Sequence, residues 1–260
     1  MISLEQVRKA YPPAGAGQSP TIAVESMDLS LANGQFCSVV GPSGCGKTTV
    51  LNMVAGFERP TAGKIMANDR IVTKPGPDRA VVFQQAALLP WLTVEENLAF
   101  GLTLRDGPRS VDRDRVRDMT EVMGLVGFER HYPYHLSGGM QQRVAIGRAL
   151  LINPDVLLMD EPFGALDAQT RADMQRFLLN LWSELNPTVL FVTHDVEEAI
   201  LLADRVVVMS PRPGRIVADI TVTLSRPRKW DAVLSREFGD LRKQVLEALQ
   251  PAQTQERRSS

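Results

Sequence analysis

The sequence predicts an α/β fold built around a mostly parallel β-sheet, and two features of its pattern support this prediction. Short, wholly apolar segments of strand length recur along the chain, and helix-like segments separate them. Strands that are apolar on both faces are typical of a parallel sheet with helices on either side. The 260 residues suffice for one large domain or two small ones with a buried core.

The predicted strands and helices alternate along most of the chain. Strands are expected at Gln35–Val40, Ala80–Phe83, Val156–Met159, Thr188–Val192 and Arg205–Met209. Helices are expected at Lys47–Ala55, Gly139–Leu151, Ala168–Glu184 and Val196–Leu202.

Three parts of the chain depart from this alternation. The amino-terminal segments MISLEQVRKAY, TIAVESMDLSL and GKIMANDRIV indicate short antiparallel strands joined by turns. Between about residues 85 and 153 helical segments replace strands, which predicts a helical subdomain inserted into the core, and the main domain is expected to span 1–225. Residues 226–260 predict a carboxyl-terminal helical extension, amphipathic through Val233, Phe238, Leu241, Val245, Leu246 and Leu249.

Composition and termini limit the possible functions and compartments. The formal net charge of −1 gives no basic footprint, so no nucleic-acid partner is expected. The start of the chain lacks the apolar run of a signal peptide, and no segment approaches the ~18 apolar residues of a membrane span. Cys37 and Cys45 make no disulfide framework and indicate a reducing compartment. The chain is expected in the cytoplasm unless a partner holds it at a membrane.

A glycine-rich loop between a predicted strand and a predicted helix matches the phosphate-loop pattern G-x-x-x-x-G-K-[ST]. In this loop Lys47 supplies a mobile positive charge to phosphate oxygens, the Thr48 hydroxyl is a ligand for Mg²⁺, and Cys45 is a small filler. The backbone N–H groups and the positive end of the helix complete an anion site. The expected ATP-binding residues here are Gly41, Pro42, Ser43, Gly44, Cys45, Gly46, Lys47, Thr48 and Thr49.

A second motif, VLLMDEP, narrows the class of nucleotide-binding protein. Its hydrophobic strand ends at Asp160, whose carboxylate is expected beside the bound metal. Glu161 follows directly and is expected to orient or deprotonate the attacking water. No N-K-x-D motif is present, which argues against a GTPase.

The third motif is LSGGM at Leu136–Met140, and with the two motifs above it resembles the ABC ATPase family over nearly the whole chain. The resemblance implies a P-loop NTPase core, a RecA-like sheet with an antiparallel amino-terminal β subdomain. It identifies Gln84 with the family's Q-loop, Asp167 of GALD with its D-loop, and His194 of VTHD with its switch histidine. These matches imply catalytic roles for Gln84 and His194, with His194 in contact with the γ-phosphate. They also imply a metal contact for Gln84 and a nucleotide contact for Asp167. Tyr11 resembles the aromatic residue that stacks on adenine, although a core tyrosine is nearly as plausible.

The LSGGM motif also predicts a second anion site. Ser137, Gly138 and Gly139 open a long helix whose free N–H groups and positive end suit a phosphate. Because one domain needs one phosphate site, the second suggests a partner's γ-phosphate, and the resemblance implies a head-to-tail dimer with two ATP molecules between the copies. Met140 stands where the family usually has Gln, so the capping box is lost and Gln141 and Gln142 are candidates to compensate.

The resemblance favours the energising subunit of a transporter over a soluble ABC ATPase of DNA repair or translation. No long coiled coil fits between Lys47 and Ser137, and the chain carries one ATPase domain. The implied partners are two transmembrane permease subunits and, indirectly, an extracytoplasmic solute-binding protein, at the cytoplasmic face of the cell membrane. The segments FQ, LLPWLTVEENLAFGL and SPRPGRIV resemble the nitrate, sulfonate and taurine importer group. The apolar side chains of Leu88, Leu89, Trp91 and Leu92, in the loop after Gln84, either pack inward or meet a partner, and the resemblance favours a docking surface for the permease.

Overall fold

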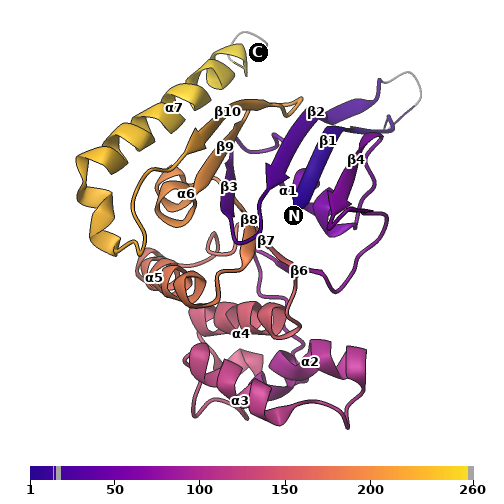
Figure 1. The fold of residues 1–260 in the computed structure, drawn as a ribbon, viewed down its shortest axis with the longest axis vertical. Helices are drawn as coiled ribbons and strands as arrows, with labels where there is room; N and C mark the ends of the chain where they lie inside the picture. The colour runs from indigo at the N-terminus through magenta and orange to yellow at the C-terminus, as the bar shows by residue number, and fades with distance from the viewer. Residues whose placement is uncertain (14, 16–18, 257–260) are drawn as a thin grey trace.

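The computed structural model describes residues 1–13, 15 and 19–256, and within these ranges the chain forms two β-sheets surrounded by helices (Figure 1). The larger sheet has the strand order β10-β9-β3-β8-β7-β6, and all neighbours are parallel except β10 and β9. The expected strands lie within one residue of the observed ends. This confirms the α/β class. The strands are Phe36–Val40 (β3), Arg79–Val82 (β6), Val156–Asp160 (β7), Thr188–Thr193 (β8), Arg205–Met209 (β9) and Ile216–Thr221 (β10).

The larger sheet is buried on both faces, as its apolar strands predict. In β8, Leu190 and Val192 face a core shared with helix α1 (Lys47–Ala55) and the amino-terminal strands. Val189 and Phe191 face the opposite core, which includes residues of α5 (Ala168–Leu185) and α6 (Val196–Leu202). The sheet is therefore the central layer. Because both of its faces are covered, the polar loops lie at the ends of its strands.

The smaller sheet is antiparallel, with the order β2-β1-β4-β5. Its strands are Ile2–Tyr11 (β1), Thr21–Leu31 (β2), Ala62–Ala67 (β4) and Arg70–Ile71 (β5). The amino-terminal segments predicted as antiparallel strands form β1 and β2, which have 10 and 11 residues, and register shifts interrupt their pairing. Asn68 and Asp69 have φ of 47° and 61°, as a two-residue hairpin turn requires.

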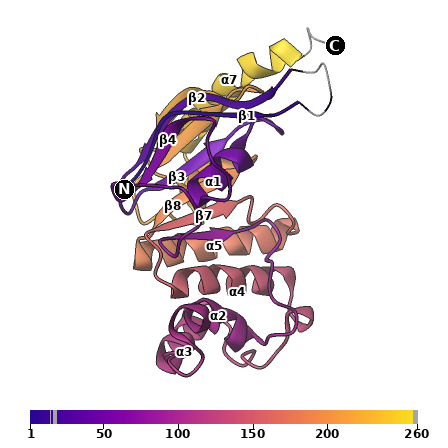
Figure 2. The same cartoon turned by 90° about the vertical axis from the view of Figure 1, so that its right-hand side faces the viewer.

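The inserted segment forms a helical layer at one end of the molecule (Figure 2). It contains α2 (Val94–Asp106), α3 (Arg113–Val122), a short 3-10 turn at Pro133–His135 and α4 (Gly138–Leu151), with α4 lying between α2 and the rest of the protein. The Thr93 side chain and Glu96 form a capping box that fixes the start of α2. Among the helices of the described residues, none is long and apolar enough to cross a membrane.

The carboxyl-terminal extension forms a 3-10 turn at Trp230–Leu234 and the long helix α7 (Arg236–Glu256), which runs along α6 and β10 (Figure 1). Phe238, Leu241 and Val245 are buried as predicted, whereas Leu246 is 40% exposed and lies outside this contact. The last four residues of the predicted extension, 257–260, lie outside the described residues.

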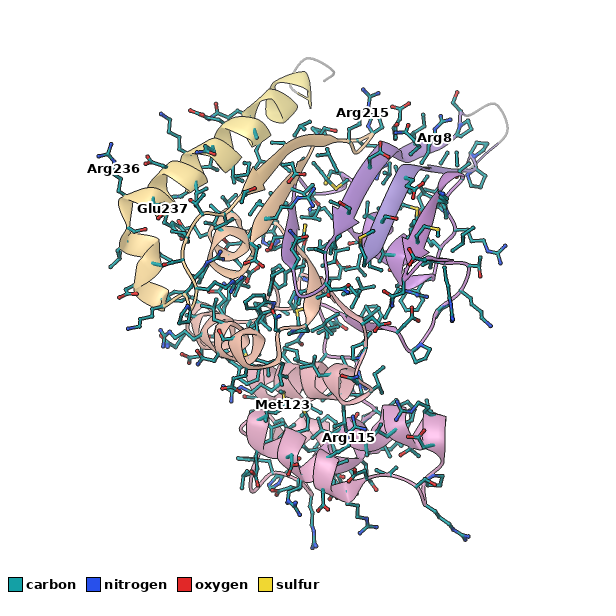
Figure 3. All side chains as sticks on the ribbon, in the orientation of Figure 1. Arg8, Arg115, Met123, Arg215, Arg236 and Glu237 are labelled. Carbon is teal, nitrogen blue, oxygen red and sulfur yellow. The ribbon has the colours of Figure 1, made fainter. Side chains whose placement is uncertain are left out.

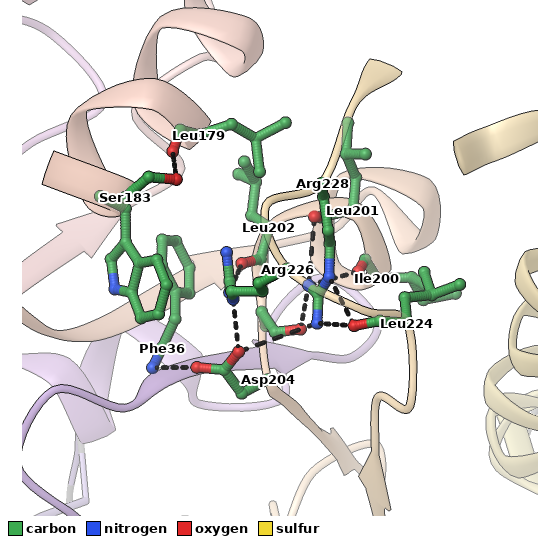
Figure 4. Close-up of polar contacts among 12 residues, drawn as sticks. Phe36, Leu179, Ser183, Ile200, Leu201, Leu202, Asp204, Leu224, Arg226 and Arg228 are labelled. Atoms are coloured by element: carbon green, nitrogen blue, oxygen red, sulfur yellow. Dashed lines mark hydrogen bonds and ion pairs between the residues drawn. The ribbon is translucent and has the colours of Figure 1, made fainter. Parts of the chain in front are cut away.

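Two arginines tie this extension to the core (Figure 4). The Arg228 guanidinium is buried and donates to the carbonyl oxygens of Ile200, Leu201 and Ala203 at the end of α6. Burial lowers the pKa of Arg228 to about 10. Arg226 donates to Asp204 Oδ1 at 2.8 Å. The end of α6, whose last carbonyls lack helical partners, is thus capped by the segment that follows β10.

Candidate functional site

The predicted phosphate-binding and acidic residues come together because β3, β8 and β7 are adjacent parallel strands. The carboxyl ends of such strands lie at one edge of the sheet. The phosphate loop follows β3, Glu161 follows β7 and His194 follows β8. A cavity of about 430 Å³ opens beside the phosphate loop, and its walls are Tyr11, Thr21, Ala23, Ser43, Gly44, Gly46, Lys47, Thr48, Thr49, Glu161 and Arg212.

The phosphate loop depends on glycine at two positions where the backbone has positive φ. Gly44 has φ 75° and Gly46 has φ 103°. A Cβ at Gly46 would also lie 2.9 Å from the carbonyl oxygen of Ala23, so the loop packs directly on β2. Lys47 is buried, and its ammonium donates to the carbonyl oxygens of Gly41 at 2.8 Å and Pro42 at 3.2 Å. The lysine charge is therefore held inside the loop.

The Cys45 thiol is fully buried under the same loop, and burial raises its pKa. A thiol with a raised pKa has little reactive thiolate. The geometry fits the predicted filler role.

Thr48 and Asp160 provide adjacent oxygen atoms of the kind that Mg²⁺ prefers. The Thr48 hydroxyl donates to Asp160 Oδ1 at 3.1 Å, across the space between α1 and β7. Burial raises the pKa of Asp160, whereas the hydrogen bond from Thr48 acts to lower it. A partly desolvated carboxylate next to a hydroxyl fits a divalent cation, because a cation would offset the cost of burying the charge.

Glu161 and His194 are in direct contact at the ends of β7 and β8. Their closest atoms, Glu161 Oε2 and His194 Nδ1, are 2.8 Å apart. The Glu161 backbone has φ 45°, and its N–H donates to the carbonyl oxygen of Val192 at 2.8 Å. This unusual conformation directs the carboxylate away from the strand, and Glu161 lines the cavity beside Lys47.

Gln84 and Asp167 lie outside the walls of this cavity. Gln84 follows β6, and a Cβ at Gly164 would lie 3.1 Å from its amide nitrogen, so Gln84 is placed against the loop that carries Asp167. The Asp167 side chain caps α5 by accepting from the N–H groups of Gln169 and Thr170, and its hydrogen bonds with Thr170 lower its pKa. The predicted metal contact of Gln84 and nucleotide contact of Asp167 stay predictions.

Tyr11 and Thr49 line the same cavity as the phosphate loop, so the tyrosine is not buried in the core. The Tyr11 hydroxyl donates to Glu58 at 2.7 Å, which leaves the ring at the wall of the cavity. Sequence reasoning missed Glu58, Thr21, Ala23 and Arg212. These residues belong to no phosphate-binding pattern. Tertiary packing brings Thr21, Ala23 and Arg212 to the cavity wall, and it brings Glu58 to the Tyr11 hydroxyl.

The second predicted anion site begins α4 on the helical layer. Ser137 and Gly138 are exposed, and the Ser137 hydroxyl accepts from the N–H of Met140 at 3.3 Å. Cβ atoms at Gly138 and Gly139 would come within 3.1 Å of Leu166 and 2.7 Å of Thr170, so these glycines permit close packing on the start of α5.

The two glutamines after Met140 make contacts other than the expected compensation. Gln141 donates to the carbonyl oxygens of Pro133 and Leu136. Gln142 donates to the carbonyl oxygen of Phe83. They join α4 to the preceding turn and to the end of β6.

The predicted exposed surface of the helical layer is smaller than expected. Trp91 is 69% exposed, but Leu88, Leu89 and Leu92 are only half-exposed because the loop folds back on Asn97 and Leu88 packs on the core. Trp91 and Leu92 form one wall of a hollow of about 580 Å³, whose other walls include Phe100, Val111 and Val116.

Comparison with known proteins identifies the family. A family model described as ABC transporter matches residues 24–164. The chain belongs to the ABC transporter family. A relative from Bacillus cereus, the aliphatic sulfonates import ATP-binding protein, is 45% identical over 247 residues, covering 95% of this chain and 94% of that protein. An uncharacterized ABC transporter ATP-binding protein from Methanocaldococcus jannaschii is 48% identical over 227 residues, covering 87% and 84% of the two chains.

Solved structures agree with this assignment. A dimeric, post-hydrolysis ATP-binding cassette bound to ADP and Pi superposes with a TM-score of 0.72 at 32% identity, covering 86% of this chain and 100% of that one. The predicted P-loop NTPase core is confirmed. As an ATP-binding member of this family, the chain is an ATP hydrolase that powers transport.

Proposed function

We propose that this chain is the ATP-hydrolysing subunit of an importer for small anions of the nitrate, sulfonate and taurine kind. One observation carries the proposal: the near full-length similarity to the aliphatic sulfonates import ATP-binding protein. Transport into the cell would place the chain at the cytoplasmic face of the membrane, held there by two permease subunits, with a solute-binding protein on the other side.

In the proposed reaction, each polar group at the strand ends has a separate task. Lys47 and the loop amides bind the phosphates. Thr48, Asp160 and Gln84 would hold Mg²⁺, which would neutralise phosphate charge. Glu161 accepts a proton from the attacking water, and His194 keeps the carboxylate oriented through their 2.8 Å contact. Tyr11 provides a ring for adenine.

The proposed working unit is a head-to-tail dimer. The exposed start of α4, at Ser137 and Gly138, supplies N–H groups and a positive helix end to the γ-phosphate bound by the other copy. The dimeric cassettes with similar folds support this arrangement. Asp167 precedes α5 and lies next to Gly138 through Leu166, which supports a role for it at the same interface.

The hollow beside Trp91 is the proposed docking site for the permease. Trp91 is an exposed, large apolar side chain beside the half-exposed Leu92, and Gln84 lies in the segment that joins the end of β6 to this loop. A permease segment in the hollow would cover apolar area and could transmit its movement toward Gln84.

A matched pair of variants tests the docking site. Trp91→Asp should leave basal ATP hydrolysis of the isolated chain within about twofold, because the side chain lies outside the nucleotide cavity. In vesicles with the permease it should reduce transport at least tenfold, since a charge would be buried at an apolar contact. Leu104→Asp is the control, because Leu104 is 72% exposed on α2 but does not line the hollow. Equal transport by both variants, with unchanged melting temperatures, would refute the docking assignment.

The transported solute is tested separately. Vesicles containing this chain, its permease and its binding protein should take up alkanesulfonates, taurine or nitrate in an ATP-dependent manner. Uptake of an unrelated solute with none of these anions transported would overturn the substrate class and leave the ATPase assignment intact.

A further inference from the structure

A turn after β9 brings an arginine to the nucleotide cavity. Arg212 belongs to the segment 210–215 between β9 and β10, far in sequence from the phosphate loop, yet it lines the cavity together with Tyr11 and Gly44. A guanidinium nitrogen of Arg212 lies 3.8 Å from the position of a Cβ at Gly44. The arginine is therefore at the rim of the anion site.

The backbone of this turn is fixed against the phosphate loop. The Gly214 N–H donates to the Ala23 carbonyl at 2.9 Å, and the Glu25 N–H donates to the Gly214 carbonyl at 2.9 Å. On its other side Gly214 packs so closely on the Cys45 carbonyl that a side chain would collide with it. The Ser210 hydroxyl closes the turn by accepting from the Arg215 N–H at 3.0 Å. Because β2 and the phosphate loop hold the turn from both sides, Arg212 keeps its place relative to the phosphates.

The two arginines of the turn differ in their partners. Arg215 pairs with Glu25 and lies at the outer edge of the molecule near Arg8 (Figure 3). Within residues 1–13, 15 and 19–256, the Arg212 side chain makes no hydrogen bond or ion pair. Burial raises the pKa of the Tyr11 phenol, and the charge of Arg212 opposes this rise. Among the described residues that line the cavity, Lys47 is the other cationic side chain.

We propose that Arg212 is a second cationic contact for the bound nucleotide, at the part of the phosphate chain nearest the adenosine. Its proximity to Gly44, on a cavity wall that it shares with Tyr11, supports this position. A guanidinium offers several donors to phosphate oxygens in a fixed plane, whereas Lys47 acts as a point charge within the loop. The inference rests on the nucleotide-binding part of the proposed function and is independent of the transported solute.

The test compares Arg212→Ala, Arg212→Lys and the control Arg215→Ala, by calorimetry with ADP and with ATP in the presence of EDTA. Arg212→Ala should raise the Kd of both nucleotides by about the same factor, roughly tenfold, equivalent to about 1.4 kcal/mol. The Kd values of Arg212→Lys should lie between those of Arg212→Ala and the wild type, because the charge is kept and the planar donors are lost. Arg215→Ala should bind like the wild type.

Melting temperatures separate a lost contact from a damaged fold. Arg212 is exposed, so the nucleotide-free Arg212→Ala protein should melt like the wild type, while its stabilisation by ADP should shrink. If Arg212→Ala bound ADP with the same Kd as Arg215→Ala, the inference would be overturned. A loss of affinity restricted to ATP would also overturn it, because the contact would then be at the γ-phosphate. A wild-type chain that binds neither nucleotide would refute nucleotide binding itself.

Discussion

Replacing Glu161 with Gln is the sharpest test of how the strand-end residues act. The change keeps the shape of the side chain and removes one negative charge. The amide can still bond to His194, which lies 2.8 Å from the carboxylate, and the Glu161 N–H still donates to Val192. The loop geometry should therefore survive, so that any loss of rate reports the chemistry of the carboxylate.

The expected loss of hydrolysis follows from the proposed general-base role. A positioned base contributes roughly 10²–10⁴-fold. At 1.36 kcal/mol for each tenfold change, this raises the barrier by about 2.7–5.4 kcal/mol. Nucleotide binding should be kept or strengthened, because Lys47 and Thr48 remain and a carboxylate on the cavity wall no longer repels the phosphates.

Two assays follow these effects. Single-turnover hydrolysis measures the chemical step, and size-exclusion chromatography with Mg-ATP measures association. Uncleaved ATP should hold two copies of Glu161→Gln together through the start of α4, and the added Ser137→Arg change should separate them, because it places a bulky side chain at the exposed helix start. Turnover close to that of the wild type would refute the reasoning and make His194 the first candidate for the base.

Two further predictions concern buried ionisable side chains. Arg228→Ala should lower the free energy of unfolding, measured by urea titration, by about 3–5 kcal/mol, because carbonyls at the end of α6 lose their donor. The control Arg236→Ala, at an exposed site, should change the free energy of unfolding by less than ~0.5 kcal/mol, and similar values for both variants would contradict the capping role. Burial raises the pKa of Glu198 in the folded protein above its pKa in the unfolded chain. The wild type should therefore lose stability as the pH rises from the unfolded-state pKa through the folded-state pKa, and Glu198→Gln should not show this loss. Unfolding titrations of both proteins from pH 4 to 8 measure this difference. If Glu198→Gln were less stable than the wild type at pH 7, the folded state would favour the ionised carboxylate and the prediction would be wrong.

The sequence was sufficient to predict the central sheet and the loops at its edge. Apolar runs of strand length marked β3, β7, β8 and β9 to within a residue, because a strand buried on both faces has no polar alternation to confuse its ends. Asp160 ends β7 and Lys47 ends the loop that follows β3, so a parallel sheet is enough to bring both residues to the same edge.

The rest of the site depends on contacts between segments that no local pattern connects. Arg212 reaches the cavity because Gly214 fits between β2 and the phosphate loop, whereas Arg215 of the same turn pairs with Glu25. The apolar pattern around Trp91 likewise predicted an exposed loop but could not show that Asn97 folds it back. Local sequence specifies where a polar group leaves a strand, whereas the packing of distant segments determines which other groups it meets. Residues of the second kind, such as Arg212, are therefore the ones for which structure adds most to the assignment of function.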